Sequence, residues 1–409
     1  MNENNTQNVI PNVDSKSQEE RNVPDLRFSF EDSWIKKKLS DISIRITRKN
    51  KKLESTLPLT ISAEYGLVDQ ETFFNRKVAS NNIEGYYLLY NGEFAYNKSY
   101  SNNYPWGAIK RLDSYDKGVI STLYICFKPK DEINSDYLTH YFETTKWHNQ
   151  ISEIAVEGAR NHGLLNIPVN DFFNTFHMFP TSEEQLKIAT FLNLIQLRIE
   201  TQKKIINNLK SLIISIKNRE FYNSKGYNEK LENILIEIND KTIINNQYEV
   251  LSSTIKGIVK QSEYFDRTVA SENNIGYKIV NRGNIVVSPQ NLWMGNISYN
   301  DKFEVGIVSP SYKIFNVNNN FNEQYIFEML TTKKSLYLFK TISEQGASIV
   351  RRNLNYEAFM QLTFNIPSLN KQNEFIEKLN LLQDKLCLEN KILSLFEKQK
   401  QYLLNKLFI

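Results

Sequence analysis

The chain has 409 residues and a formal net charge of +4, from 50 Lys or Arg against 46 Asp or Glu, and this length has room for two domains of ordinary size. No run approaches the roughly 20 apolar residues of a membrane span, and the N-terminus lacks the apolar core of a signal peptide, so we expect a soluble, cytoplasmic protein. The two cysteines, Cys126 and Cys387, and the four histidines form no Cys-x-x-Cys pattern, which argues against a disulfide and against a metal site.

The N-terminal half is predicted to hold a short tail and a first domain. Residues 1–24 are rich in Asn, Gln, Ser and Glu without an apolar period, which is typical of a disordered tail. A first domain is expected over 25–180. Within it, runs such as 86–90 and 118–127 favour strands, and Asn134 is a suitable cap for a helix with Tyr137 and Tyr141 on its inner face. These patterns indicate a mixed α+β domain.

A long helix is predicted over 181–223. It is expected to open with a capping box in which the Ser182 oxygen accepts a backbone N–H and Gln185 reaches back. Apolar residues then recur in steps of four and three, the register of a coiled coil. The predicted seam residues are Ile188, Leu192, Ile195, Ile199, Gln202, Ile206, Leu209, Ile213 and Ile216.

The second half of the chain repeats the first. With a shift of 191, residues 66–92 lie ungapped on 257–283, and 12 of these 27 positions are identical. A second domain is therefore predicted over 224–367 and a second long helix over 368–409. We expect the two helices to pack as an antiparallel coiled coil, with Gln202 opposite Glu389. The second seam is Phe375, Leu379, Leu382, Leu386, Glu389, Leu393, Phe396, Lys400 and Leu403.

The copies diverge most in the loops that follow Gly92 and Gly283. Amides, aromatic rings and cations in these loops suit contacts with base edges and phosphates. A basic cluster also follows a Gly-Ala pair in each copy. A generic surface loop has a similar composition, and a basic cluster is often only solvated, so both alternatives stay open. The candidate DNA-binding residues are Lys98, Tyr100, Asn102, Asn103, Lys110, Arg111, Arg160, Gln290, Asn291, Asn296, Arg351 and Arg352.

Catalytic patterns are absent from the sequence. It has no Gly-x-x-x-x-Gly-Lys-Ser/Thr, no Gly-x-Gly-x-x-Gly, and no Asn-Pro-Pro-Phe/Tyr of the kind that amino-methyltransferases use around a flipped base. The sequence therefore predicts a recognition protein with no catalytic residues and no metal site of its own.

The sequence resembles the specificity (S) subunit of type I restriction-modification enzymes over 26–409. The resemblance lies in the opening Leu26-Arg27-Phe28 with Trp34, the Pro-x-x-x-x-Gln start of both long helices, and their ends, Asn-Arg-Glu-Phe and Asn-Lys-Leu-Phe. It implies two target-recognition domains, each reading one half of a split, asymmetric DNA site, with the helices as a spacer. It also implies a bacterial host-defence complex with two modification subunits, which methylate adenine using S-adenosylmethionine, and restriction subunits, which use ATP and magnesium.

Two other functions stay open at this point. The first is a stand-alone, duplicated DNA-binding regulator or scaffold without enzymatic partners. The second is a free-standing methyltransferase, which the missing catalytic patterns disfavour.

Overall fold

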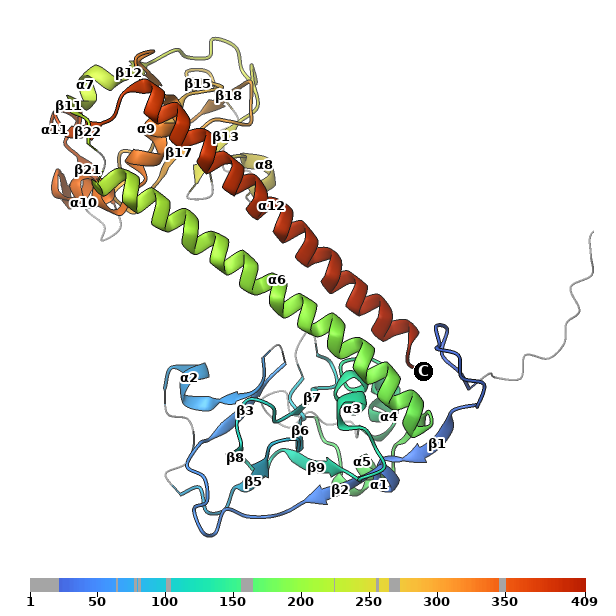
Figure 1. The fold of residues 1–409 in the computed structure, drawn as a ribbon. Coiled ribbons are helices and arrows are strands. Elements are labelled where there is room, and N and C mark those ends of the chain that lie inside the picture. The colour runs from blue at the N-terminus through green and yellow to red at the C-terminus, as the bar shows by residue number, and fades with distance from the viewer. Residues whose placement is uncertain are drawn as a thin grey trace, which may run out of the picture. The chain divides into compact units, whose positions relative to one another are not determined.

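The computed structural model describes residues 22–409, except 64, 77–78, 80–81, 101–103, 156–164, 224, 255–256, 265–272 and 346–350. The chain divides into two compact units. Unit 1 is Met1–Gln202 with Ile392–Ile409, and unit 2 is Lys203–Lys391. The division passes through two long helices, α6 (Ser182–Asn223), green in Figure 1, and α12 (Leu369–Lys406), red in Figure 1. Each unit therefore contains one mixed domain and one segment of each long helix.

Unit 1 is built on a four-stranded antiparallel sheet in the order β2-β9-β6-β7, with the further strand pairs β1-β10, β3-β4 and β5-β8. Its elements before α6 are β1 (Ile35–Lys38), α1 (Leu39–Ile42), β2 (Ser43–Ile46), β3 (Leu59–Ser62), β4 (Gly66–Asp69), α2 (Gln70–Phe74), β5 (Tyr87–Tyr90), β6 (Phe94–Asn97), β7 (Ala108–Arg111), β8 (Lys117–Ile120), β9 (Ile125–Pro129), α3 (Ser135–Tyr141), α4 (His148–Ile154), α5 (Val169–Asn174) and β10 (Phe176–Phe179).

Unit 2 repeats this topology: a sheet in the order β12-β19-β16-β17 and the pairs β11-β22, β13-β14 and β15-β18, to which it adds the pair β20-β21. Its elements between α6 and α12 are β11 (Tyr227–Lys230), α7 (Leu231–Ile234), β12 (Leu235–Ile238), β13 (Leu251–Thr254), β14 (Gly257–Lys260), α8 (Gln261–Tyr264), β15 (Lys278–Asn281), β16 (Ile285–Val287), the 3-10 helix η1 (Leu292–Met294), β17 (Ile297–Tyr299), β18 (Val305–Val308), β19 (Lys313–Val317), α9 (Glu323–Leu330), α10 (Lys333–Thr341), β20 (Ser343–Gln345), β21 (Arg352–Leu354), α11 (Tyr356–Met360) and β22 (Thr363–Ile366). The predicted fold class, two duplicated α+β domains with two long helices, is confirmed.

Two equivalent glycines, Gly118 and Gly306, are each required by close packing against a leucine. A Cβ added to Gly118 would lie 2.4 Å from a side-chain carbon of Leu59, and one added to Gly306 would lie 2.3 Å from a side-chain carbon of Leu251. Real Cβ contacts are not this short, so both positions exclude a larger residue for the same steric reason. The repeated glycine therefore reflects close packing of β8 and β18 against a leucine of β3 and β13.

The two long helices run antiparallel where they contact each other in unit 1. In unit 1, Lys400 Nζ donates to Gln196 Oε1 over 2.9 Å, and the Arg198 guanidinium lies 4.4 Å from the centre of the Phe396 ring. A higher number on α6 thus meets a lower number on α12. All eighteen predicted seam positions are buried or half-buried. Gln202 belongs to unit 1 and Glu389 to unit 2, so their predicted contact stays a prediction.

The predicted capping box at Ser182 is wrong. The backbone N–H of Glu184 donates to Thr181 Oγ1 over 3.4 Å, whereas Ser182 Oγ donates to the carbonyl of Glu132 over 3.2 Å. Thr181 therefore caps α6, because its hydroxyl reaches the first-turn N–H. The Ser182 hydroxyl instead ties the helix to the segment before α3.

Gln185 has a different role from the one predicted. Its Nε2 donates to the carbonyl of Pro180 over 3.0 Å, and its Oε1 accepts the backbone N–H of Asn134 over 3.0 Å. Asn134 in turn caps α3 by accepting the N–H of Tyr137, as predicted. One buried amide thus joins the start of α6 to the cap of α3.

The same arrangement recurs in unit 2. Gln372 Nε2 donates to the carbonyl of Pro367 over 2.8 Å, and Gln372 Oε1 accepts the backbone N–H of Asn322, the cap of α9, over 2.9 Å. Gln185 and Gln372 are both almost fully buried. We call each arrangement a glutamine clamp. It gives a physical reason for the repeated Pro-x-x-x-x-Gln pattern.

The ends of the long helices close the two cores in equivalent ways. Near the end of the chain, the Phe408 ring packs 5.2 Å from the ring of Tyr137 in unit 1. At the end of α6, the Phe221 ring packs 5.2 Å from the ring of Tyr325 in unit 2. The repeated terminal Phe of the two helix ends therefore fills the same place beside α3 and α9.

Candidate nucleic-acid interface

The first candidate loop leaves β6 at Asn97 and returns to the sheet at β7. Lys98 is half-buried, and its backbone carbonyl accepts the N–H of Leu165 over 2.9 Å, which anchors the start of the loop. Tyr100 is 53% exposed and Tyr104 is also exposed. Both rings are therefore accessible to a ligand. The candidates Asn102, Asn103 and Arg160 lie outside the described residues.

Arg111 is held by acidic groups within the protein. Its Nε lies 2.6 Å from Asp113 Oδ1, and its Nη1 lies 2.7 Å from Asp136 Oδ1 and 2.9 Å from Ser135 Oγ. Asp136 is in the first turn of α3, so Arg111 connects β7 to that helix. With two carboxylates in contact, its guanidinium is a poorer candidate for a phosphate contact than the sequence suggested.

A chain of polar contacts continues from Asp136 to both long helices. Asp136 Oδ2 accepts from Asn193 Nδ2 over 2.9 Å, and Asn193 Oδ1 lies 2.8 Å from His140 Nε2. His140 Nδ1 lies 3.3 Å from Glu143 Oε2, which forms a 2.8 Å ion pair with Lys400 of α12. Burial raises the pKa of Glu143, but the His140 hydrogen bond and the Lys400 charge outweigh it and lower that pKa to about 2. Glu143 is therefore ionised at neutral pH.

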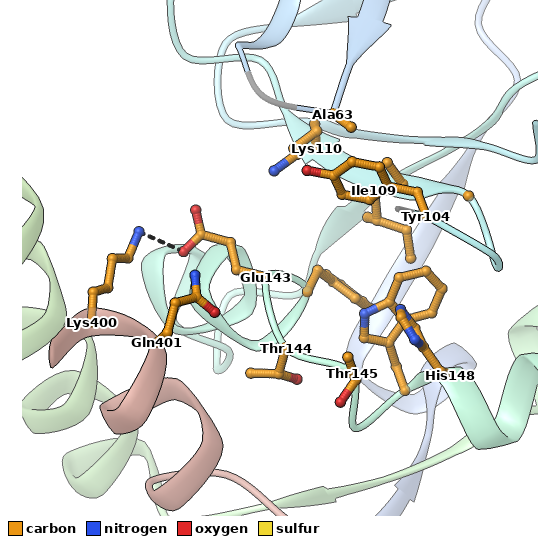
Figure 2. Close-up of a pocket in the computed structure, with 14 residues that line it drawn as sticks. Ala63, Tyr104, Ile109, Lys110, Glu143, Thr144, Thr145, His148, Lys400 and Gln401 are labelled. Carbon is orange, nitrogen blue, oxygen red and sulfur yellow. Dashed lines mark ion pairs between the residues drawn. The ribbon is translucent and has the colours of Figure 1, made fainter. Parts of the chain in front are cut away.

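Lys110 lies beside this network at the edge of a pocket. Among the described residues its ammonium has no hydrogen-bond or ion-pair partner. Burial lowers the pKa of Lys110, the nearby Glu143 raises it and Lys400 lowers it. The pocket has a volume of about 370 Å³ and is shown in Figure 2. Its walls come from β7, the turn between α3 and α4, and α12, together with Tyr104 of the first loop.

The second candidate loop lies between β16 and β17. Gln290 is exposed, and its backbone carbonyl accepts the N–H of Arg352 over 3.1 Å. Asn296 Oδ1 accepts from Ser253 Oγ over 3.0 Å, so this side chain is engaged within the sheet. Asn291 precedes η1, and its buried Oδ1 finds no hydrogen-bond partner among the described residues. Gln290 is thus the most accessible of the three predicted amides.

A cation and aromatic cluster stands beside this loop. The Arg352 guanidinium donates from Nε to Ser343 Oγ over 2.9 Å and lies 5.9 Å from the centre of the Trp293 ring. Lys340 Nζ lies 5.7 Å from the same ring. Arg351 is exposed. Two cations therefore converge on one indole, an arrangement that suits stacking and phosphate contacts.

Sequence reasoning missed helix α10. Lys333, Lys334, Tyr337 and Lys340 are all exposed, and Tyr337 is 67% exposed. Spacings of three and four place Lys333, Tyr337 and Lys340 along one face of the helix. We call these four residues the α10 basic face. The signal was present as Lys-Lys-x-x-Tyr-x-x-Lys, but it lies outside the divergent loops on which the prediction concentrated.

Metal-binding clusters and membrane-spanning helices are absent from the described part of the chain. It contains no group of three or more His, Cys, Asp or Glu side chains arranged to hold a metal ion. None of its helices is long and apolar enough to cross a membrane.

Comparison with solved structures gives the strongest information on the fold. No protein-family model and no curated protein matches the chain. The S subunit of a type I restriction-modification system from M. genitalium matches with a TM-score of 0.51 and 15% identity, over 95% of this chain and 99% of that one. A chain of a type I restriction-modification system, solved to explain complex assembly and conformational transition, matches with a TM-score of 0.56 and 13% identity, over 93% of this chain and 99% of that one. The chain has the fold of a type I S subunit. The HsdS subunit from Thermoanaerobacter tengcongensis is also similar, with 13% identity and a TM-score of 0.49 over 93% of this chain and 98% of that one.

Within this S-subunit fold the two candidate loops occupy equivalent positions. Each follows a central strand of the four-stranded sheet, β6 or β16. Each is also anchored by a backbone hydrogen bond from the segment before α5 or α11, from Leu165 to Lys98 and from Arg352 to Gln290. The surroundings differ, because the aromatic and basic groups come from the loop itself in unit 1 and from η1, α10 and β21 in unit 2.

Proposed function

We propose that this chain is the DNA sequence-recognition subunit of a type I restriction-modification complex. The observation that carries the proposal is the likeness to type I system chains over nearly the whole length of both proteins, with a TM-score of 0.56 over 93% and 99%. A DNA target split into two halves fits the two repeats. Unequal halves fit the different side chains around the two equivalent loops.

Direct contact with DNA is assigned to the accessible groups of each unit. In unit 2 these are the α10 basic face, the Trp293 cluster and Gln290. In unit 1 they are Tyr100 and Tyr104, and the half-buried Lys98 lies beside them at the start of the same loop. Exposed lysines neutralise phosphates and release counterions, whereas amides and aromatic rings contact bases. The α10 basic face should therefore supply affinity, and the loops should supply sequence preference.

We assign adenine methylation to two modification subunits that use S-adenosylmethionine, and DNA cleavage to restriction subunits that use ATP and magnesium. An apolar groove in unit 1 supports a docked partner. It includes Leu194 and Leu197 of α6, which are 60% and 57% exposed, and Phe396 of α12. Leu381, which is Leu194 shifted by 187, is 70% exposed in unit 2. An exposed leucine that repeats in both units fits two copies of one partner.

Purification of the tagged chain from its host tests the partners. We expect an adenine methyltransferase at two copies per chain. Leu194→Glu combined with Leu381→Glu should release it, because charge on an apolar contact costs desolvation free energy. Leu123→Glu, at a leucine that is 61% exposed and outside the helices, is the matched control. Purification without any methyltransferase would favour the stand-alone DNA-binding regulator.

Methylation-sensitive sequencing of the host genome tests recognition itself. Deleting the gene should remove one bipartite adenine-methylated motif. Exchanging residues 26–179 for the same domain of a relative should change only one half of that motif. If no motif disappears on deletion, the chain does not direct methylation.

A salt titration tests the α10 basic face. Lys333→Gln and Lys340→Gln should each weaken binding to matched and scrambled DNA alike, and each should reduce the slope of log K against log salt by about 1. Gln290→Ala should instead weaken only the matched target, by ~1–3 kcal/mol. Equal losses of affinity for both DNAs in Gln290→Ala would show that this amide does not read bases.

A further inference from the structure

The pocket beside β7 has a cationic wall. Glu143 Oε2 is contacted by both His140 and Lys400, and Lys400 Nζ also donates to Gln196 Oε1 over 2.9 Å. Lys110, the other cation of this wall, has no hydrogen-bond or ion-pair partner among the described residues. Figure 2 shows Lys110, Glu143 and Lys400 on the same side of the pocket. Two lysines and one carboxylate leave one positive charge uncompensated, and this favours an anion.

The opposite wall is aromatic. Trp147 is only 2% exposed, and its Nε1 finds no hydrogen-bond partner in the described part of the chain. The neighbouring His148 ring lies 4.5 Å from the Trp147 ring. Burial lowers the pKa of His148, so its imidazole is neutral at pH 7 and offers one donor and one acceptor nitrogen.

The size of the pocket restricts the ligand. A volume of about 370 Å³ falls near the lower end of the range for small-molecule sites, roughly 300 to 1,000 Å³. Such a volume exceeds what an isolated inorganic anion needs. It suits a ligand with an anionic group at one end and a planar, polar ring at the other.

The described part of unit 2 has a different residue at the position of Lys110. Lys110 pairs with Ala95 in the β6–β7 register, and Ser298 pairs with Val286 in the equivalent β16–β17 register. Ser298 is fully buried, and its hydroxyl lies 2.8 Å from Ser253 Oγ. The cation of unit 1 is thus replaced by an internal hydroxyl, so the described part of unit 2 lacks the lysine on which this site depends.

We propose that this pocket, which we name the junction pocket, binds a nucleoside monophosphate, with the phosphate at Lys110 and the base against Trp147 and His148. Two sources supply this chemistry: a free nucleotide, or one nucleotide unit of the DNA that unit 1 contacts. Binding of a free nucleotide goes beyond the proposed function, because reading two halves of a duplex requires no mononucleotide site. Binding of a nucleotide unit of DNA rests on the proposed function and deepens it.

Calorimetric titration of the full-length chain without DNA tests the junction pocket. AMP, GMP, CMP and UMP are compared with adenosine and inorganic phosphate, and at least one nucleotide should bind more tightly than both parts. Lys110→Gln should weaken nucleotide binding about tenfold, the loss expected for one charge-assisted hydrogen bond. Lys128→Gln, at an exposed lysine of β9, is the matched control and should leave binding unchanged.

A second variant and a competition complete the test. His148→Ala should weaken nucleotide binding but not phosphate binding, because His148 faces the base. DNA that displaces the nucleotide identifies a nucleotide unit of DNA as the natural occupant, and independent binding identifies a free nucleotide. The proposal is overturned if no nucleotide binds better than phosphate, or if Lys110→Gln binds nucleotides as the native chain does. Loss of the methylated motif on gene deletion tests the proposed function separately.

Discussion

Replacing the clamp glutamine of unit 1 should destabilise that unit by several kcal/mol. Gln185→Met keeps most of the side-chain volume and removes both hydrogen bonds of the clamp. The carbonyl of Pro180 and the N–H of Asn134 then lose their partner. Water does not replace that partner easily, because Gln185 is only 1% exposed. Each of these two buried polar groups left unsatisfied costs ~1–3 kcal/mol, so we expect a loss of about 2–6 kcal/mol. Gln185→Ala should cost more, because it also leaves a cavity.

Urea unfolding followed by tryptophan fluorescence measures this loss. Unit 1 contains Trp34, Trp106 and Trp147, and unit 2 contains Trp293, so a Trp293→Phe background reports on unit 1 alone. Separate units can unfold in separate transitions, which makes this selectivity necessary. Gln399→Met, at an exposed glutamine of α12, is the matched control. If Gln185→Met and Gln399→Met differ by less than about 0.5 kcal/mol, the clamp does not stabilise the domain as argued.

Three other predictions follow from the structure and the repeat. Gly118→Ala and Gly306→Ala should each lower the thermal midpoint of their own unit in calorimetry, because the new Cβ would lie 2.4 or 2.3 Å from a leucine carbon. Burial lowers the pKa of His177 to about 4, so the unfolded chain binds a proton that the folded chain excludes. Unit 1 should therefore lose up to about 3 kcal/mol as the pH falls from 6.5 toward 4, and His177→Gln should remove this part of the dependence in urea unfolding. Inserting four residues near Gln202 and four near Glu389 should change the spacer of the methylated motif and leave its half-site bases unchanged, as sequencing would show.

The repeat, the long helices and the caps of α3 and α9 were predictable because their signals are local. A seam in steps of three and four specifies one helix face whatever the surroundings, and Asn134 and Asn322 cap through a hydrogen bond to a residue three positions ahead. The role of Gln185 was not predictable in this way. Its acceptor contact comes from Asn134, 51 residues earlier in the chain, and no periodicity encodes a contact at that separation.

The assignment of DNA contacts depended on divergence between the copies, and β7 shows why that criterion alone is weak. Arg111 and Tyr299 hold equivalent places, paired with Phe94 and Ile285 in their sheets. Arg111 contacts Asp136 at the start of α3, and Tyr299 Oη donates to Glu323 at the start of α9 over 3.0 Å.

Two different residues thus make the same link between sheet and helix, so their divergence reflects compensation within the fold and carries no information about DNA. Divergence indicates a ligand contact only where the side chain is also exposed and is not held by a hydrogen bond or an ion pair within its own domain. By this standard Tyr100 and the α10 basic face are stronger candidates than Arg111 or Asn296. The variants of the α10 basic face should therefore affect DNA binding more than Arg111→Gln, whose first effect should be a loss of stability in unit 1.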